Sequence, residues 1–379
     1  MNVFKHVITL AVIGSAVFIC SPAHALWGYP VNPPKAPSLT KTTYLTNPNV
    51  GQIQAAIKPN TRIVVIGTVN ASGGGRLRIN VDDVRLSFNR AKLINWTGDD
   101  TWEGFVNISG SRVQVVDLRL NVGANSGRCR GITLQTPTSD VRINNCHFKG
   151  TADGLVADGE WERIAISNSS FINCGDFAHP SPDGPREGGY GMFFEDDDWN
   201  PDHLRISNVQ VTLAPDAGQH GIRMSQVQNA IVEGSNIAAT KKRAFWAYGV
   251  NQLAIRRSTF RNGSMLFSLM PHEHYTDRES RHVRIDSCRI EHNTILQPLG
   301  IYCSKGMRDF RFRDLDIVST TSPNWLSLGW QTDALSQHIR WYEGTITFNG
   351  RTVVGRQWTS INDFTLQEQA QLKIGPMTP

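Results

Sequence analysis

The stretch DVRINNCHF (Asp140–Phe148) decides the fold, because altered copies of it recur along the chain. The copies include RIAISNSSF, HLRISNVQV, QLAIRRSTF, HVRIDSCRI, DFRFRDLDI and HIRWYEGTI. Self-similarity at a fixed period indicates a repeat architecture. Most copies follow one another after 23 to 30 residues, and one step of 40 residues contains the insertion GDFAHPSPDGPREGG. The first apolar residues of the copies are Val84, Val113, Val141, Ile164, Leu204, Ala230, Leu253, Val283, Phe310 and Ile339.

Each copy alternates apolar and polar residues, as a half-buried strand does. A second short strand precedes it and often starts with glycine, as in GITL, GLVA, GMFF and GIRM. Strands and turns without a helical period between them predict the stacked coils of a parallel β-solenoid. A β-propeller fits poorly, since each blade needs four strands and about 40 residues or more. The residues expected inside the solenoid are Val141, Ile143, Ile206, Ile255, Ile285 and Phe312.

The N-terminal residues have the pattern of a secretory signal. Lys5 precedes a short apolar run, and Ala23-His24-Ala25 follows it as a cleavage site. A membrane anchor is the weaker interpretation because the run is short. We therefore expect a secreted or periplasmic protein with no membrane segment after cleavage. The expected organisation is a signal peptide at 1–25, an N-terminal extension and cap at 26–69, the β-helix at 70–350 and a C-terminal cap at 351–379.

The charge and the cysteine content limit the classes of ligand and of metal site that the chain is expected to bind. The chain has 379 residues and a formal charge of +5, which becomes +4 when Lys5 leaves with the signal. A mildly basic surface suits an acidic partner, whereas nucleic-acid binders cluster their charge more strongly. The six cysteines form no CxxC pair, so no zinc site is expected. A Cys146–Cys174 disulfide is the weaker alternative to buried thiols that act as small hydrophobic side chains.

The repeats, together with the helical segment IQAAI that precedes a strand, resemble the right-handed parallel β-helix superfamily of pectate lyases, polygalacturonases and related polysaccharide-active proteins. The resemblance covers the chain from about residue 45 to about residue 350. It implies an all-β, right-handed parallel β-helix of about ten coils with a short N-terminal capping helix. The handedness comes from the resemblance and not from the spacing. It also implies action on a polysaccharide, without fixing the reaction.

The strand that contains Arg223 defines an outward face. If Ile222 and Met224 point inward, Arg223 points outward, because successive side chains in a strand face opposite sides. A contiguous row of aromatic side chains on this face predicts a groove for a polysaccharide. The alternative is a loop that covers the row. The candidate substrate-binding residues are Phe193, Trp246, Tyr248, Phe267, Tyr302, Lys242, Lys305 and His272.

A lyase acting on a uronic-acid polymer is the first functional hypothesis. Arg223 or Arg243 would neutralise the uronate carboxylate, and His220, whose ordinary pKa lies near neutrality, would take the C5 proton. Tyr190 would supply or relay the second proton. We expect His220 and Arg223 to face solvent. A turn histidine bonded to the backbone is the alternative for His220.

Two other functions remain open. A glycoside hydrolase would use a carboxylate pair, here Asp153 and Glu195. TADG and EDDDW loosely echo two elements of the polygalacturonase pattern, but its RIK element is missing, so this hypothesis comes second. The third is an exported glycan-binding protein without catalysis. Calcium binding at Asp196, Asp197 and Asp198 is conceivable by analogy with pectate lyases, but we predict no metal or cofactor. We expect a monomer whose partner is an anionic polysaccharide.

Overall fold

The computed structural model describes part of residues 31–354. The ranges outside the described residues are 1–30, 73–74, 90, 95, 97–102, 123–128, 176–188, 196–201, 215–219, 240–242, 263–264, 269–279, 293–300, 304–306, 320–328, 331–339, 342–343, 349–350 and 355–379. The expected signal peptide and all but the first four residues of the expected C-terminal cap therefore lie outside the description.

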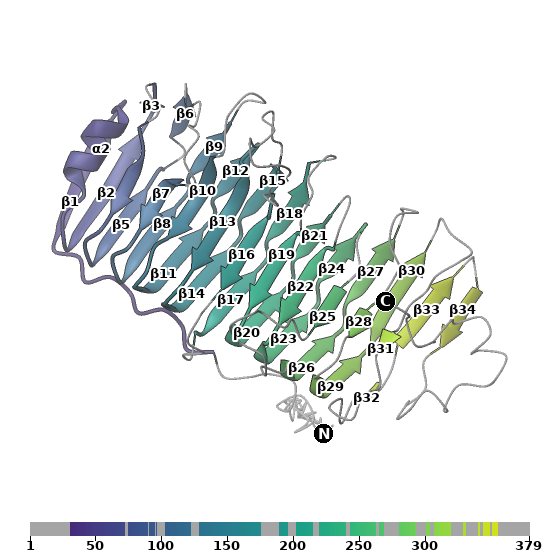
Figure 1. The fold of residues 1–379 in the computed structure, drawn as a ribbon. Coiled ribbons are helices and arrows are strands. Elements are labelled where there is room, and N and C mark those ends of the chain that lie inside the picture. The colour runs from purple at the N-terminus through teal and green to yellow at the C-terminus, as the bar shows by residue number, and fades with distance from the viewer. Residues whose placement is uncertain are drawn as a thin grey trace, which may run out of the picture.

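The described chain winds into a parallel β-solenoid in which strands from successive coils stack into three long sheets (Figure 1). Sheet I contains 12 strands: β1 (Lys41–Thr46), β2 (Thr61–Ile66), β5 (Val84–Ser87), β8 (Val113–Val116), β11 (Thr138–Asn144), β14 (Trp161–Ser167), β17 (Leu204–Ser207), β20 (Gln228–Glu233), β23 (Asn251–Arg256), β26 (Ser280–Asp286), β29 (Met307–Arg313) and β32 (Arg340–Trp341).

Sheets II and III complete the coils, and each contains 10 of the described strands. Sheet II consists of β4 (Leu77–Ile79), β7 (Gly104–Ile108), β10 (Arg130–Leu134), β13 (Asp153–Asp158), β16 (Met192–Glu195), β19 (Ile222–Ser225), β22 (Phe245–Tyr248), β25 (Met265–Ser268), β28 (Ile301–Cys303) and β31 (Gly329–Trp330). Sheet III consists of β9 (Arg119–Asn121), β12 (His147–Lys149), β15 (Ser170–Cys174), β18 (Gln210–Leu213), β21 (Asn236–Ala238), β24 (Thr259–Arg261), β27 (Arg289–His292), β30 (Leu315–Ser319), β33 (Gly344–Phe348) and the antiparallel β34 (Arg351–Val354).

The register of sheet I confirms the repeat alignment read from the sequence. Val84 pairs with Val113, Val141 with Ile164, and the same row continues through Leu204 to Phe310. The six residues expected inside the solenoid are each at most 1% exposed. The fold class is therefore confirmed. The expected count of about ten coils differs from the structure, in which the described residues form 12 strands of sheet I.

The short turn from sheet I to sheet III is built on a residue with left-handed backbone. Asn145, Asn168 and Asn208 occupy this position in three neighbouring coils, with φ of 54°, 51° and 53°. Asparagine tolerates this conformation better than most residues. The amides also bond between coils, since Asn208 Nδ2 donates to Asn168 Oδ1 at 3.3 Å and Asn168 Nδ2 donates to Asn144 Oδ1 at 3.0 Å. The NN and SN dipeptides of the repeats therefore specify this turn.

The glycines at the start of the sheet II strands are required because neighbouring backbone and sheet III side chains pack closely against them. A Cβ added to Gly154 would lie 2.3 Å from the Gly191 carbonyl oxygen and 2.4 Å from the Phe171 ring. A Cβ on Gly191 would lie 2.1 Å from Val211 Cγ1, and one on Gly221 would lie 2.4 Å from Ile237 Cγ2. Each glycine thus makes room for an inward side chain of sheet III.

The predicted cap at the start of the solenoid is confirmed. Helix α2 (Val50–Ala56) precedes β2, and Val50 and Ile53 are buried against the first coil. Asn49 is its N-cap and forms a capping box with Gln52, in which each side chain accepts from the other residue's backbone N–H.

An N-terminal strap, residues 31–40, runs along the edge of sheet I in an extended path without helix or strand. Figure 1 shows it as the purple trace that leads from β1 towards β17. Ser38 N–H donates to Asp83 Oδ1 at 2.8 Å, and Lys35 N–H donates to Asp140 Oδ1 at 2.7 Å. Asn32 N–H donates to His203 Nδ1 at 3.2 Å. The strap therefore binds three separate coils.

The strap contacts every second coil because its period matches the stacking distance. Three residues of extended, proline-rich chain span about 9.3 Å, and two coils span about 9.6 Å. Asp83, Asp140 and His203 each stand just before the first apolar residue of β5, β11 and β17, which are each two coils apart. The bonding residues Asn32, Lys35 and Ser38 alternate with prolines, which have no N–H to donate.

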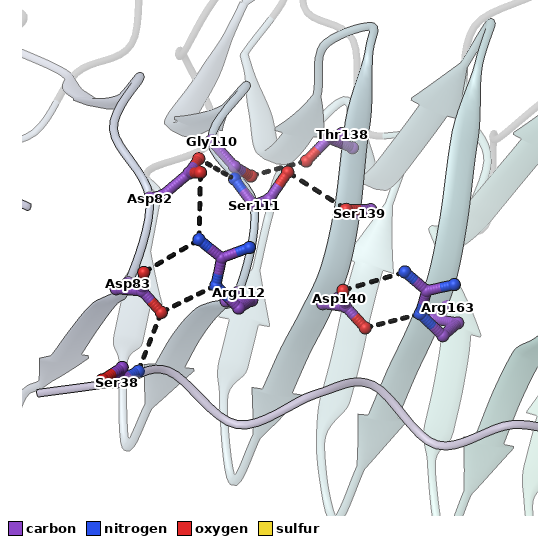
Figure 2. Close-up of polar contacts among 10 residues, drawn as sticks. All are labelled: Ser38, Asp82, Asp83, Gly110, Ser111, Arg112, Thr138, Ser139, Asp140 and Arg163. Carbon is purple, nitrogen blue, oxygen red and sulfur yellow. Dashed lines mark hydrogen bonds and ion pairs between the residues drawn. The ribbon is translucent and has the colours of Figure 1, made fainter. Parts of the chain in front are cut away.

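Arginines in the intervening coils pair with the two aspartates of this row, as Figure 2 shows. Arg112 Nε donates to Asp83 Oδ1 at 2.8 Å, and Arg163 Nε donates to Asp140 Oδ1 at 2.6 Å. The Arg112 hydrogen bond holds the pKa of Asp83 below its ordinary value. Burial alone would raise the pKa of Asp140, but Arg163 and the Lys35 N–H hold it below its ordinary value.

The described cysteines are buried free thiols, as expected, and no Cys146–Cys174 bridge forms. Burial raises the pKa of Cys146, Cys174 and Cys288 to about 12. In the described part of the chain, no helix has the length and apolar character needed to cross a membrane.

Candidate active site

The outer face of sheet II gathers the candidate residues around Arg223. Ile222 and Met224 are fully buried on the inner side, so Arg223 lies on the outer side, as the alternation predicts. Phe193 of β16 and Trp246 of β22 are its direct partners in register. The row of Glu195, Ser225 and Tyr248 lies two residues further along the same strands. We call the surface formed by these two rows and by Tyr190 and His220 the Arg223 site.

One predicted member of the aromatic row is placed wrongly by the sequence alignment. Leu266, not Phe267, pairs with Trp246, and Phe267 pairs with the inward Ala247. A slip of one residue moves a side chain to the opposite face of a strand. Tyr302 pairs with Leu266 and so keeps the register expected for the outward row.

Four aromatic rings surround the guanidinium of Arg223. Its Cζ lies 4.8 Å from the Phe193 ring centroid, 4.9 Å from Trp246, 5.3 Å from Tyr248 and 5.6 Å from Tyr190. Each ring is within the distance at which a cation is attracted to an aromatic face. The aromatic residues predicted to stack on a sugar thus also enclose the cation of the site.

The two tyrosines fix the orientation of Arg223. Nη1 donates to the Tyr190 hydroxyl at 2.8 Å, and Nη2 donates to the Tyr248 hydroxyl at 2.5 Å. Burial alone would lower the pKa of Arg223, but the two hydroxyls hold it above its ordinary value. Its Nε is buried and has no hydrogen-bond partner among the described residues. The expectation that Arg223 simply faces solvent is therefore wrong, because the aromatic rings cover much of it.

A phenol and a carboxylate continue the network. The Tyr248 hydroxyl donates to Glu195 Oε1 at 3.3 Å, and Ser225 Oγ donates to the same oxygen at 2.9 Å. Trp161 Nε1 on sheet I donates to the Glu195 backbone carbonyl at 3.0 Å. Burial raises the pKa of Tyr248 above its ordinary value although Arg223 opposes the shift, so Tyr248 is a neutral phenol at neutral pH.

His220 is buried, with 1% of its surface exposed, which corrects the expectation that it faces solvent. Its ring packs edge-on against Trp246, with centroids 4.6 Å apart, and lies 6.1 Å from Tyr190. The backbone N–H of Arg243 donates to His220 Nδ1 at 3.3 Å. This is the backbone-bonded histidine that the sequence left as an alternative. Because Nδ1 accepts this bond, the ring proton lies on Nε2.

Asp153 holds the backbone of the next coil in place. Its Oδ1 accepts from the N–H groups of Gly189 and Tyr190 at 3.1 and 3.0 Å, and Arg130 Nε donates to its Oδ2 at 3.1 Å. Asp153 is 2% exposed. Three donors therefore occupy this buried carboxylate, which supports the position of Tyr190.

The carboxylate pair expected for a hydrolase does not form. Leu155 pairs with Met192, so Asp153 stands beside Tyr190, five residues before Glu195 along the strand direction. Five residues of strand span about 16 Å. Paired carboxyl groups of glycosidases lie only about 5–9.5 Å apart. Asp153 and Glu195 are thus too far apart to flank one glycosidic bond.

Arg243 is half-buried, and its Cζ lies 5.7 Å from the Trp246 ring, so it borders the Arg223 site. Several predicted contacts fall outside the described residues: Lys242, His272, Lys305 and the acidic residues Asp196, Asp197 and Asp198. The side chains of Phe267 and Tyr302 are likewise not described. Among the residues that are described, no group of three metal-ligating side chains is present.

Comparison with known proteins identifies the fold. No protein-family model matches the sequence, and no curated protein matches it. An alginate lyase from Paenibacillus sp. str. FPU-7 is similar in structure with a TM-score of 0.50 and 13% identity, over 73% of this chain and 95% of the lyase. The two structures share the parallel β-helix fold. At this identity the similarity supports the fold alone.

Other β-helix proteins are more distant. The A-module of the mannuronan C-5 epimerase AlgE4 from Azotobacter vinelandii has a TM-score of 0.38 and 14% identity, over 73% of this chain and all of the module (100%). A pectate lyase from Bacillus sp. N165, in complex with trigalacturonate, has a TM-score of 0.30 and 10% identity, over 75% of this chain and 84% of the lyase.

Proposed function

We propose that this chain is an exported enzyme that binds an anionic polysaccharide at the Arg223 site and cleaves it by β-elimination. The reaction needs a cation to neutralise the uronate carboxylate, a base to take the C5 proton and an acid to protonate the leaving oxygen. The observation that carries the proposal is a guanidinium on the outer face of sheet II that four aromatic rings enclose and two phenols orient.

Arg223 is suited to hold the carboxylate. A guanidinium has five N–H donors, and the two phenols accept from only two of its nitrogens. Each phenol accepts one N–H of a different Nη, so the second N–H of each Nη is left for a carboxylate. The rings also exclude water, and this strengthens an ion pair. Arg243, beside Trp246, would assist from the neighbouring coil.

Tyr190 and His220 are suited to move the protons. The Tyr190 oxygen accepts from Arg223, and a cation that donates to a phenol oxygen stabilises negative charge on it, so we assign Tyr190 as the base. Neutral His220 carries its proton on Nε2 and is assigned as the donor to the leaving oxygen. The two rings lie 6.1 Å apart, within reach of one sugar residue. The sequence analysis gave His220 as the base and Tyr190 as the proton donor, so these assignments exchange the two roles.

Phe193 and Trp246 complete the site as platforms. Both side chains are half-buried, so part of each ring remains open to a ligand. Sugar rings have apolar faces that pack on aromatic side chains. Phe193 and Trp246 stand on either side of Arg223, two strand spacings or about 9.6 Å apart, so a polymer running along the solenoid would meet both.

The test is incubation with alginate, polygalacturonate and a neutral glucan, with ultraviolet absorbance and reducing ends both recorded. We expect absorbance from unsaturated ends with an anionic polymer only, and its loss in Arg223→Ala. Arg205→Ala, which removes an exposed arginine from sheet I, is the matched control and should retain activity. Reducing ends without absorbance would replace the lyase by a hydrolase, and retention of polymer without cleavage would replace it by a glycan-binding protein.

A further inference from the structure

A second groove lies on sheet III, away from the Arg223 site. It has a volume of about 630 Å³ and is lined by β6 (Lys92–Ile94), β9, β12 and β15. Strand β6 pairs with β3 (Thr68–Asn70) in a separate two-stranded sheet, and no strand pairing among the described residues joins β6 to β9 (Figure 1). The groove therefore opens where the ladder of sheet III is interrupted, and backbone groups of both strand edges are left for a ligand.

Three cations line this groove without ion pairs. Lys92, Arg119 and Lys149 are exposed, and no carboxylate among the described residues forms an ion pair with any of them. At the other end of sheet III, by contrast, Arg261 and Arg289 are both paired with Glu291. Within the described part of the chain, the positive charge of the groove is therefore not neutralised by an ion pair, unlike that of Arg261 and Arg289 on the same sheet.

The remaining lining suits a sugar chain. Half-buried Ile172 supplies an aliphatic surface, while Asn121 and Ser170 supply hydrogen-bonding groups. No aromatic side chain of the lining is exposed, since Phe148 is 1% exposed, so the groove lacks the stacking surface that single-stranded nucleic acids require. One acid stands nearby: Asp117 lines the adjoining polar pocket with Arg119, but it accepts from Asn145 Nδ2 at 2.6 Å.

We propose that this groove is a second binding site, which holds a carboxylated polysaccharide chain on sheet III while another part of the polymer occupies the Arg223 site. Arg119 and His147 stand opposite each other in register, as do Asn121 and Lys149, so the groove crosses successive coils. Lysine and arginine contact carboxylates by charge-assisted hydrogen bonds. The choice of polymer rests on the proposed function, but binding in the groove does not require catalysis.

The test compares two double variants matched in charge. Lys92→Gln/Lys149→Gln removes two cations from the groove, and Lys41→Gln/Lys58→Gln removes two exposed lysines elsewhere. Binding of long polygalacturonate and alginate is measured by affinity electrophoresis and calorimetry in the Arg223→Ala background, so that the polymer stays intact. We expect the groove variant to bind about two- to thirtyfold more weakly than the control, the range for two exposed charge pairs.

Turnover separates this proposal from the proposed function. In the chain with Arg223 intact, Lys92→Gln/Lys149→Gln should cleave a short oligosaccharide at the control rate, because a short chain cannot reach both sites. Equal polymer binding by the two double variants overturns the second site even if the enzyme is a lyase. A groove-specific loss without cleavage of any polymer supports the second site and refutes the lyase. Weakened binding of polyphosphate or DNA alone overturns the choice of ligand.

Discussion

Replacing Asp140 by asparagine removes one negative charge from the junction between the N-terminal strap and the solenoid. The change keeps an oxygen that can accept from the Lys35 N–H, and asparagine tolerates the left-handed backbone at this position, where φ is 58°. It therefore isolates the ion pair with Arg163, in which Nε and Nη2 bind the two carboxylate oxygens at 2.6 and 3.0 Å.

The expected loss lies between the values for buried and exposed ion pairs. Breaking a buried pair costs about 3–5 kcal/mol, and an exposed pair contributes about 0–1 kcal/mol. The Asp140 side chain is 2% exposed and that of Arg163 is 17% exposed, so we expect a loss of about 2 kcal/mol. Chains of 150–250 residues lose about 2–4 °C of Tm per kcal/mol, and the lower value suits this longer chain, which gives about 4 °C.

The loss should depend on pH. The folded pKa of Asp140 is depressed, so its contribution to stability is fully present above the unfolded pKa of about 3.9 and is lost as the pH falls through the folded value. The Tm difference between wild type and Asp140→Asn should therefore be constant from pH 7 to about pH 5 and shrink below about pH 4.

Differential scanning fluorimetry across this pH range measures the effect. Asp83→Asn is the matched control: it removes the equivalent carboxylate, whose partner Arg112 is 34% exposed, so its effect should be smaller. Limited proteolysis within residues 31–40 would show earlier cleavage in Asp140→Asn. Equal Tm values for wild type and Asp140→Asn at pH 7, or a difference that persists unchanged at pH 3, would refute the reasoning.

Four further predictions concern the Arg223 site and Gly191. Trp246→Ala should weaken glycan binding by about 1–3 kcal/mol in calorimetry, because aromatic contacts carry energies of that order, and unchanged affinity in a folded variant would exclude the ring from the ligand. His220→Gln should lower kcat by about 10²–10⁴ as a proton donor is lost, and full activity would exclude His220 from proton transfer. Arg223→Lys should not restore the activity of Arg223→Ala, because an ammonium cannot bind two phenols and a carboxylate in one plane; recovery would show that charge alone suffices. Gly191→Ala should lower Tm by several degrees, because its Cβ would lie 2.1 Å from Val211 Cγ1, whereas an unchanged Tm would show that the corner can expand.

The fold could be predicted because the repeat fixes the register of sheet I. Every coil from Val84 to Phe310 presents its first apolar residue in one row, so one alignment placed the inner residues. The prediction failed at Phe267 because MLFS lacks the initial glycine of GIRM and GMFF, and either phase of this strand places an apolar residue inside. The sequence alone could not separate the two phases.

The burial of His220 and Arg223 could not be read from alternation. Alternation assigns a side chain to a face, whereas its exposure depends on the rings that flank it in neighbouring coils. The strap was missed although two signals were present. One is the spacing of Asn32, Lys35 and Ser38 among prolines, and the other is the aspartates, arginines and histidine just before the first apolar residues of the repeats. The strap residues and their partners are far apart in the sequence, so the equal spacing of the two sets is not apparent from the sequence alone.

The strap also orders the assembly of the molecule in time. Its three backbone bonds join residues 45, 105 and 171 positions apart in the chain. Ser38 finds Asp83 after the first coils form, whereas Asn32 must wait for His203. Each docked bond brings the next strap residue close to its partner two coils on, so the closure entropy of every later step is that of a short segment. In a chain synthesised from its N-terminus, the strap would therefore bind coil after coil as the solenoid grows. Asn32 would bind last, once β17 has formed.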